Sequence, residues 1–191
     1  WSLGADNSVT DDPFVIAAST ALGTTNIMSA VVAGSINYPL QPAFLAYLAT
    51  NDTNTTGNGA TYTLGSGNAL TEIFDQQNNF VTTGTFTAPG AGRYMLGGGV
   101  QLQALTALMT YGLLQLVTSN RSYPLDNLNV AIARTIAAVA DTIIFSGSQL
   151  ADMDAADTFT LTVSVHGGAG NTVTVSGTAN AFSRIFGYLV C

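Results

Sequence analysis

Few side chains in this sequence could carry out chemistry. His166 is the only histidine, and it stands directly before the Gly-rich turn at residues 167–171. A Ser-His-Asp triad around it stays open, but the sequence has no Gly-x-Ser-x-Gly elbow for a nucleophile. Cys191 is the only cysteine, and no basic partner that would activate it is evident. A solvent-facing turn histidine is the simpler interpretation of His166, so we predict that the protein is not an enzyme.

Three carboxylates form a candidate metal site. Asp152, Asp154 and Asp157 follow one another at spacings of two and three residues, and their hard oxygens are suitable ligands for Ca²⁺. The same segment precedes a predicted strand, where Asp commonly organises a turn. A Ca²⁺ site also usually needs six or more oxygens. The sequence therefore leaves a Ca²⁺ site and a structural turn as alternatives, and it favours the turn. It contains no phosphate loop, Cys/His zinc spacing or dinucleotide fingerprint.

Polar loops are candidates for binding rather than catalysis. Loops at 51–59, 120–126 and 167–171 combine Asn, Thr, Asp, Arg and Tyr, which suit saccharide hydroxyls or protein epitopes. Arg and exposed aromatic residues dominate recognition hot spots, so Arg and Tyr are the strongest candidates there. The alternative is that the Tyr packs on the core and the Arg is a solvated turn charge. The candidate receptor-binding residues are Asn54, Arg121, Tyr123 and Asn171.

Alternating strands must position these loops. In segment 157–166, Phe159, Leu161, Val163 and Val165 share one parity, which predicts a half-buried strand. Segments 42–49 and 111–117 carry apolar residues on both parities, so we expect both of their faces to be covered. Strands of this length and spacing indicate an all-β sandwich.

Two further segments carry specific predictions. Residues 74–98 are expected to form a β-hairpin with one apolar face and a tight turn at 88–92, where Pro89 fixes φ. Residues 130–145 are rich in Ala, which favours a helix on propensity alone. They have many β-branched residues and no apolar stripe with a period of 3.6, so we predict strand instead.

Composition limits the kinds of partner. Hydrophobic residues make up 47% of the 191 residues and charged residues 8%, against a usual charged fraction of about 25%. Such a surface is expected to be largely buried between subunits. The net charge of −7, with four Arg and no Lys, argues against nucleic-acid binding and against an anionic membrane surface. No apolar run approaches the length of a transmembrane helix, so we predict no membrane insertion.

The segment with the expected hairpin carries a family resemblance. The pattern Asp75-x4-Phe80-x5-Phe86-x5-Gly92-x-Tyr94-x-Leu96, with Pro42-Ala43-Phe44 before it and Phe186-Gly187-Tyr188-Leu189 at the end, resembles the globular head of complement component one, subcomponent q. That family belongs to the tumour-necrosis-factor-like superfamily. The resemblance implies that residues 41–191 form a ten-strand, two-sheet jelly-roll sandwich within a compact homotrimer, with the last strand near the trimer axis.

One part of this pattern differs from the family. Leu96 and Gly98 stand where its members usually have aromatic residues. We therefore expect a locally repacked core, with Gly97, Gly98 and Gly99 permitting close backbone approach.

The first 40 residues resemble a different kind of protein. Trp1-x-x-Gly4-x-Asp6-Asn7-Ser8, followed by Phe14-x-Ile16 and Ala21-Leu22-Gly23-Thr24, is similar to the β-rich stalk repeats of bacteriophage tail fibres. The resemblance implies a short extended β stalk over residues 1–40, stabilised by winding or pairing with copies of itself, followed by the head.

The two resemblances together imply a function. We expect the trimeric fibre-tip domain of a viral structural protein, from a bacteriophage, carried on the virion and binding a host-surface glycan or protein multivalently. A purely structural module that trimerises and registers a fibre is the alternative. A depolymerase that uses His166 or the Asp152 and Asp154 pair is a third reading, which we do not favour.

Overall fold

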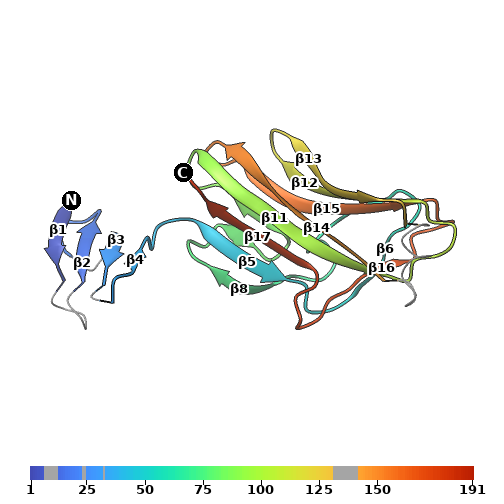
Figure 1. The fold of residues 1–191 in the computed structure, drawn as a ribbon, viewed down its shortest axis with the longest axis horizontal. Helices are drawn as coiled ribbons and strands as arrows, with labels where there is room; N and C mark the ends of the chain where they lie inside the picture. The colour runs from blue at the N-terminus through green and yellow to red at the C-terminus, as the bar shows by residue number, and fades with distance from the viewer. Residues whose placement is uncertain (7–12, 23–24, 32, 131–141) are drawn as a thin grey trace. The chain divides into compact units, whose positions relative to one another are not determined.

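The computed structural model describes residues 1–6, 13–22, 25–31, 33–130 and 142–191. These residues contain seventeen β-strands in three antiparallel sheets (Figure 1). The chain divides into two compact units, Trp1–Pro42 and Ala43–Cys191, which we call the N-terminal unit and the head. The all-β class predicted from the alternation of apolar residues is confirmed.

The N-terminal unit is one small sheet. Its strands pair in the order β1-β2-β3-β4, so that each strand lies beside the next one in the chain. Val15 and Ala17, on one face of β2, are fully buried. The strands are β1 (Ser2–Ala5), β2 (Phe14–Ala17), β3 (Asn26–Ala30) and β4 (Ile36–Asn37).

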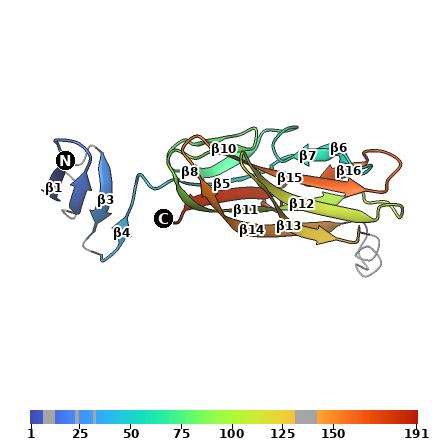
Figure 2. The ribbon, with the colours of Figure 1, turned by 90° about the horizontal axis from the view of Figure 1, so that it is seen from above.

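The head is a sandwich of two sheets, seen as two layers in Figure 2. The six-stranded sheet has the order β13-β12-β15-β10-β9, and β7 also pairs with β15. Its strands are β7 (Thr61–Thr63), β9 (Phe80–Val81), β10 (Thr85–Thr87), β12 (Tyr111–Thr118), β13 (Ser122–Leu128) and β15 (Thr158–His166).

The second sheet of the head has seven strands. Its order is β6-β16-β11-β17-β5-β8, and β14 also pairs with β11. The closing strand β17 therefore lies between β11 and β5, inside the sheet. The strands are β5 (Ala43–Tyr47), β6 (Asp52–Thr56), β8 (Thr71–Asp75), β11 (Gly92–Gln103), β14 (Ile143–Met153), β16 (Val173–Val175) and β17 (Arg184–Leu189).

The two-sheet jelly roll is thus confirmed, although its strands are more divided than the ten predicted. The chain leaves regular strand pairing between β5 and β6. It does so again between β16 and β17, which pair with β6 and β5. There, the backbone N–H of Gly177 donates to Oδ1 of Asn51 over 2.8 Å. A side chain thus satisfies a backbone donor where the regular ladder is interrupted.

Aromatic packing between the layers forms the centre of the core. Phe44 of the seven-stranded sheet stacks on Phe80 and Phe86 of the six-stranded sheet, with ring centroids 4.6 and 4.9 Å apart. Phe86 also meets Tyr94 of β11 at 5.7 Å. All four rings are almost completely removed from solvent. Burial of such large apolar surfaces is the main term that holds two sheets together.

The predicted hairpin over residues 74–98 is wrong in one respect. The strands on either side of Pro89, β10 and β11, lie in opposite sheets and face each other across the core. The connection between β10 and β11 is hydrogen-bonded to the turn before β15. Ala88 N–H donates to the Asp157 carbonyl, and Ala156 N–H donates to the Ala88 carbonyl, both over 2.8 Å. The sequence correctly predicted which residues of these strands face the core. The same alternation of apolar residues occurs whether the two strands pair in one sheet or lie in opposite sheets.

The strands expected to be covered on both faces are covered on one. In β5, Phe44 and Ala46 are buried, whereas Leu45 faces outward and is half-buried. In β12, Leu114 is buried and Leu113 is half-buried on the outer face. A single chain therefore leaves apolar residues on the outer faces of its sheets.

Part of the Ala-rich segment 130–145 can be compared with its predicted strand. Residues 143–145 lie in β14, as predicted, but Val130 is helical, so the predicted strand is wrong at that residue. The prediction for 131–141 falls outside the described residues.

The glycine triplet permits the close approach that was predicted. A Cβ at Gly98, on the core side, would lie 2.3 Å from the Arg184 carbonyl oxygen and 2.6 Å from Cδ2 of Leu161. A Cβ at Gly97, on the outer side, would lie 2.5 Å from the Gly147 carbonyl oxygen. Real Cβ atoms do not approach other atoms so closely, so these positions of β11 need glycine.

Candidate binding surfaces

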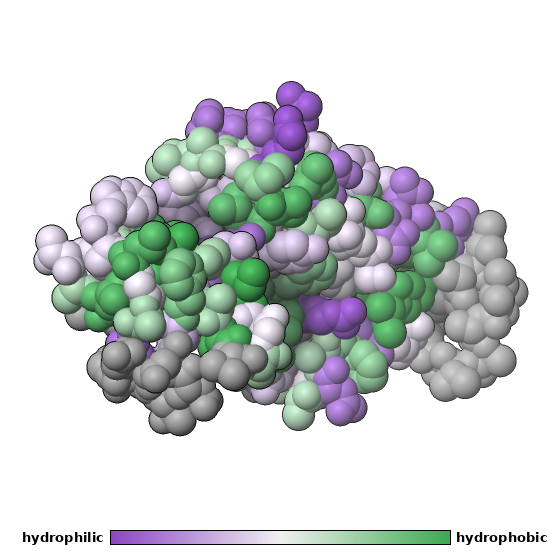
Figure 3. Space-filling model, turned by 60° about the vertical axis from the view of Figure 1, so that its left-hand side comes forward, coloured by the Kyte–Doolittle hydropathy of each residue, from purple (hydrophilic) through white to green (hydrophobic). Residues whose placement is uncertain are grey.

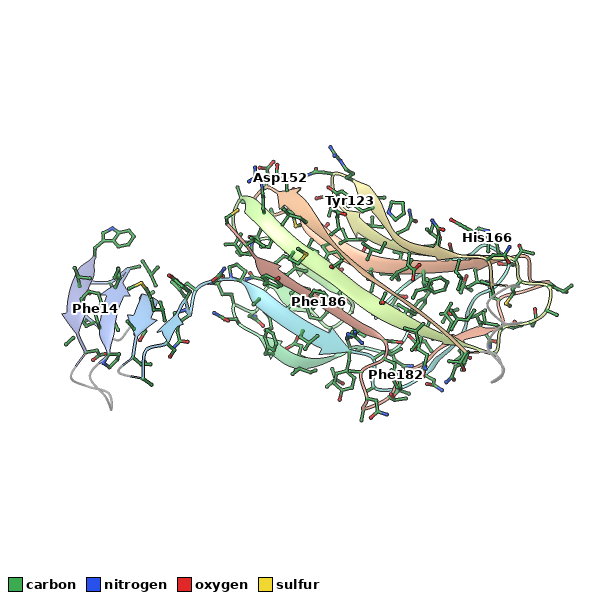
Figure 4. All side chains as sticks on the ribbon, in the orientation of Figure 1. Phe14, Tyr123, Asp152, His166, Phe182 and Phe186 are labelled. Atoms are coloured by element: carbon green, nitrogen blue, oxygen red, sulfur yellow. The ribbon has the colours of Figure 1, made fainter. Side chains whose placement is uncertain are left out.

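The strand registers give the head two ends, and the predicted site residues are divided between them. At the base, where the chain enters, Ala43 pairs with Tyr188 and Arg93 N–H donates to the Cys191 carbonyl over 2.7 Å. At the opposite end, the tip, Tyr111 pairs with His166. From that pair the β12–β15 ladder continues to Thr118, seven residues or about 23 Å away. Figure 4 shows Asp152 and Tyr123 towards the base and His166 towards the tip.

A hydrogen-bonded turn around Asp157 lies at the base. Its carboxylate accepts bonds from Ser119 Oγ at 2.7 Å, from the Asp154 backbone N–H at 2.8 Å and from Asn120 Nδ2. The bond from Ser119, followed by the bond from Asp154, lowers the pKa of Asp157 below its ordinary value. These contacts join the β12–β13 turn to the β14–β15 turn and agree with the structural-turn alternative.

The three acidic residues proposed for Ca²⁺ do not come together as a ligand set. Within the ranges described, no three acidic, histidine or cysteine side chains are grouped so that they could hold a metal ion. Asp152 lies on β14 opposite Arg93 of β11, and both oxygens of Asp157 already accept hydrogen bonds. Of Asp154, the backbone rather than the carboxylate takes part in the turn.

The Asp157 turn makes acid sensitivity testable. A carboxyl whose pKa is lowered by folding stabilises the protein above its unfolded pKa of about 3.9, and this contribution is lost as the pH falls through the folded pKa. We expect Asp157→Asn to lower the urea midpoint at pH 7 and to change it little at pH 2. Asp154→Asn, which keeps every backbone bond of the turn, is the control and should leave both midpoints nearly unchanged. An equal loss at both pH values would contradict this role of the Asp157 charge.

Arg121 and Tyr123, the two strongest candidates from sequence, both lie at the base. Arg121 is exposed. Its carbonyl oxygen accepts two hydrogen bonds from Thr118, one from the backbone N–H at 2.8 Å and one from the side-chain Oγ1 at 3.0 Å. The loop predicted over residues 120–126 is wrong from Ser122 onwards, because β13 begins there, and Tyr123 is half-buried on that strand and packs against the core. The structure therefore agrees with the alternative in which Tyr123 stabilises the sandwich and leaves Arg121 as an exposed charge on a turn.

Asn54 and Asn171 lie towards the tip, but Asn54 is in strand β6 and not in the loop predicted over residues 51–59, whereas Asn171 is in a loop. Asn54 is exposed and has a φ of 56°, a left-handed conformation that Asn tolerates better than most residues. Asn171 Oδ1 accepts a bond from the Asn58 backbone N–H at 3.4 Å, and Gly168 N–H donates to the Gly57 carbonyl at 2.8 Å. These bonds hold loops 57–59 and 167–171 side by side.

Sequence reasoning missed an aromatic pair at the same end. The exposed rings of Tyr111 and His166 lie 5.7 Å apart, and His166 Nε2 lies 3.3 Å from Ser164 Oγ. Leu108, in the preceding loop, is 64% exposed. The sequence places Tyr111 at the start of one strand and His166 at the end of another, but it does not say that these strands pair. The β12–β15 register brings them together.

A buried carboxylate fixes the loops behind the tip. Asp52 accepts a bond from the Tyr62 hydroxyl and one from the Asn68 backbone N–H at 2.9 Å. Burial, and then the hydrogen bond to Asp52, raise the pKa of Tyr62 well above its ordinary value, so its hydroxyl stays protonated as a donor. A Cβ at Gly67 would lie 2.6 Å from Asp52 Oδ2, so the chain there wraps closely around the carboxylate.

The third surface is the outer face of the seven-stranded sheet, which we call the sheet face. The register aligns Leu45 of β5 with Phe186 of β17 and with Phe74 of β8. A second row aligns Tyr188 with Met95 of β11, and Met95 with Leu150 of β14. The exposed fractions of Phe74, Leu150 and Tyr188 are 47%, 42% and 46%. Hydrophobic residues also reach the surface in the space-filling view (Figure 3). Exposed apolar residues grouped in this way make the sheet face a candidate interaction surface.

Comparison with known proteins agrees with the jelly-roll fold. No family model and no curated protein matches the sequence. Among solved structures, Eiger TNF from S. frugiperda aligns with a TM-score of 0.51 at 10% identity, covering 79% of this chain and 93% of that one. Murine APRIL at pH 8.0 aligns with a TM-score of 0.50 at 7% identity, covering 78% and 99%. The globular domain of zebrafish complement 1qA protein aligns with a TM-score of 0.47 at 14% identity, covering 78% and 98%.

The likeness to the Eiger and APRIL structures lies in the fold alone, because so few residues are identical. In the described part of the chain, no helix has the length and hydropathy needed to span a membrane.

Proposed function

We propose that the head assembles as a homotrimer through the sheet face and acts as a binding module at the tip of a fibre. The observation that carries this proposal is the exposed apolar surface of Leu45, Phe74, Leu150, Phe186 and Tyr188. An antiparallel sheet can face water on one side, but that side normally carries polar residues. The low charged fraction of 8% and the family resemblance of the hairpin segment support the same assembly.

The position at which the chain enters the head supports binding at the opposite end. Residues 1–42 join the head at Ala43, at the base, so a fibre continues from that end. The loops free to meet another surface are those at the tip, where the loop residue Asn171 is half-buried and the strand residues Asn54, Tyr111 and His166 are exposed. Side-by-side copies of these loops in a trimer would bind multivalently, so that weak single contacts give strong attachment.

The target we propose is a glycan or protein on a host cell, with the module carried on a virion. The resemblance of residues 1–40 to bacteriophage tail-fibre repeats supports the viral setting. The tip also supplies groups suited to saccharides: an exposed aromatic pair for stacking, and Asn and Ser side chains for hydroxyl groups. The proposed mechanism is attachment without catalysis.

Binding of the labelled protein to bacterial polysaccharide arrays and to intact bacterial cells tests the role of the tip. We expect Tyr111→Ala and Asn54→Asp to weaken binding about tenfold or more, because hot-spot residues contribute on the order of 2 kcal/mol. Arg121→Ala, at the base, is the matched control because it removes a similarly exposed side chain. We expect it to leave binding unchanged.

Two results would count against this assignment. Loss of binding in Arg121→Ala together with normal binding of the tip variants would place the receptor site at the base. Intact trimers that bind none of these surfaces would favour the alternative of a purely structural module that registers the chains of a fibre.

A further inference from the structure

One face of the N-terminal sheet is apolar on all four of its strands. Leu3 pairs with Ile16, and Ile16 pairs with Met28, so their side chains lie in one row. A second row, parallel to the first, consists of Ala5, Phe14, Ala30 and Ile36. Directly paired residues of antiparallel strands project to the same side of the sheet. The apolar face therefore consists of Leu3, Ala5, Phe14, Ile16, Met28, Ala30 and Ile36.

The apolar face is exposed, while the other face of the same strands holds the interior of the unit. Leu3, Phe14 and Ile36 are 65%, 46% and 55% exposed, and Figure 4 shows Phe14 on this sheet. Val15 and Ala17, which point to the other side, are fully buried. The apolar face is thus open to solvent, whereas the two apolar residues on the other face, Val15 and Ala17, are covered.

A unit of this size needs additional cover. A sheet of four short strands is stable when a hydrophobic face is packed, and folded units of about 40 residues usually need metals, disulfides or oligomerisation. The described part of the unit has no cysteine and no group of metal ligands. Oligomerisation is a further way to remove the apolar face from water.

We infer that the apolar face packs against the same face of other copies of this chain, so that the N-terminal units form their own intersubunit core. The seven residues carry no charged or polar side-chain group, so the partner surface must also be apolar, and an identical face meets that requirement. Sheets that pack face to face with interdigitated apolar side chains lie about 10 Å apart. This inference rests on the proposed trimeric head, which would supply the neighbouring copies.

Attachment to the head favours copies of this chain over other partners. Only residues 38–42 separate β4 of the N-terminal unit from β5 of the head. Three heads held together would therefore hold three N-terminal units at an effective concentration in the millimolar range. The sheet face of the head and the apolar face of the N-terminal unit would then be parts of one assembly.

Thiol protection in the full chain tests this inference. In a Cys191→Ser background, Ile36→Cys places a thiol on the apolar face, and Asn37→Cys places one on the opposite face of the same strand. Both native residues are exposed in the single chain, so both thiols should react with a maleimide at similar rates if nothing covers the sheet. We expect the thiol at position 36 to react at least tenfold more slowly than the thiol at position 37, in protein whose mass by light scattering is that of a trimer.

A second variant separates this inference from the proposed function. Adding Leu45→Asp in the head should dissociate the trimer and return the two thiols to similar rates. Equal rates in an intact trimer would overturn the inference and leave the trimeric head standing. A monomeric parent protein would overturn the trimeric head. Protection at position 36 that persists in a monomer would show that the cover is not another copy, and this would also overturn the inference.

Discussion

Leu45→Asp is expected to convert a trimer of three 19.6-kDa chains into monomers. Leu45 lies on the sheet face between Phe186 and Phe74 in the register, and it is half-buried already in the single chain. Deleting a buried Leu side chain costs about 2–5 kcal/mol, and a carboxylate buried without a partner adds to this loss. A closed trimer contains three copies of the change. The mass from light scattering, measured over a range of protein concentrations, is the readout.

Leu113→Asp provides the matched control for this prediction. Leu113 is also a half-buried Leu that faces outward from the middle of a strand, but it lies on β12 of the six-stranded sheet. We expect the Leu113 variant to stay trimeric. A parent protein that is monomeric, or dissociation by Leu113→Asp with an intact trimer for Leu45→Asp, would show that the sheet face is not the trimer interface.

The second large effect is expected at Gly98 in the core. Gly98→Ala would place a Cβ 2.3 Å from the Arg184 carbonyl oxygen and 2.6 Å from Leu161, so β11 and β17 must move apart. Overpacking of a core typically costs about 1–3 kcal/mol. We expect a loss of this size in the free energy of unfolding, measured in urea at one fixed protein concentration, since dissociation of a trimer depends on concentration.

Gly90→Ala is the control for the Gly98 substitution. A Cβ at Gly90 meets no atom within 4 Å, so the change should stay within about 0.5 kcal/mol. An equally small effect at Gly98 would mean that β11 and β17 are not as closely packed as the structure has them.

The predictions of which side chains face the core were correct because they depend only on neighbouring residues in the chain. Phe159, Leu161 and Val163 alternate with polar residues and are buried as predicted, although Thr162 and Ser164 on the other face are buried too, so the strand is not half-buried along its whole length. Tyr94 and Leu96 in β11 are also buried, as their shared parity predicts, whereas Met95 between them is half-buried. A period of two fixes which side chains share a side of a strand, whatever that strand pairs with.

The predicted hairpin failed because pairing depends on residues far away in the chain. β10 and β11 are separated by four residues, yet β10 pairs with β15 and β11 with β14 and β17. Alternation in β10 and β11 is compatible with a hairpin and with two strands facing each other across a core. The backbone bonds of Ala88 to Ala156 and Asp157 decide between them.

The candidate sites show the same division. The sequence identified Asn54, Arg121, Tyr123 and Asn171 from the polar character of their loops, and each of these residues lies at an end of the sandwich. It could not separate the two Asn residues at the tip from Arg121 and Tyr123 at the base, because that separation comes from the register of β12 with β15. The pair of Tyr111 with His166 arises from the same register.

By itself, the sequence determined the all-β class, the inward parity of the strands, the need for glycine in β11 and the shortage of charge that indicates buried surface. These follow from local backbone geometry and from the cost of leaving apolar groups in water. The tertiary structure decided which strands share a sheet, which loops meet at each end, and which apolar faces remain uncovered. Those depend on contacts between residues distant in the chain, such as Leu45 with Phe186 and Tyr111 with His166, which no local pattern specifies.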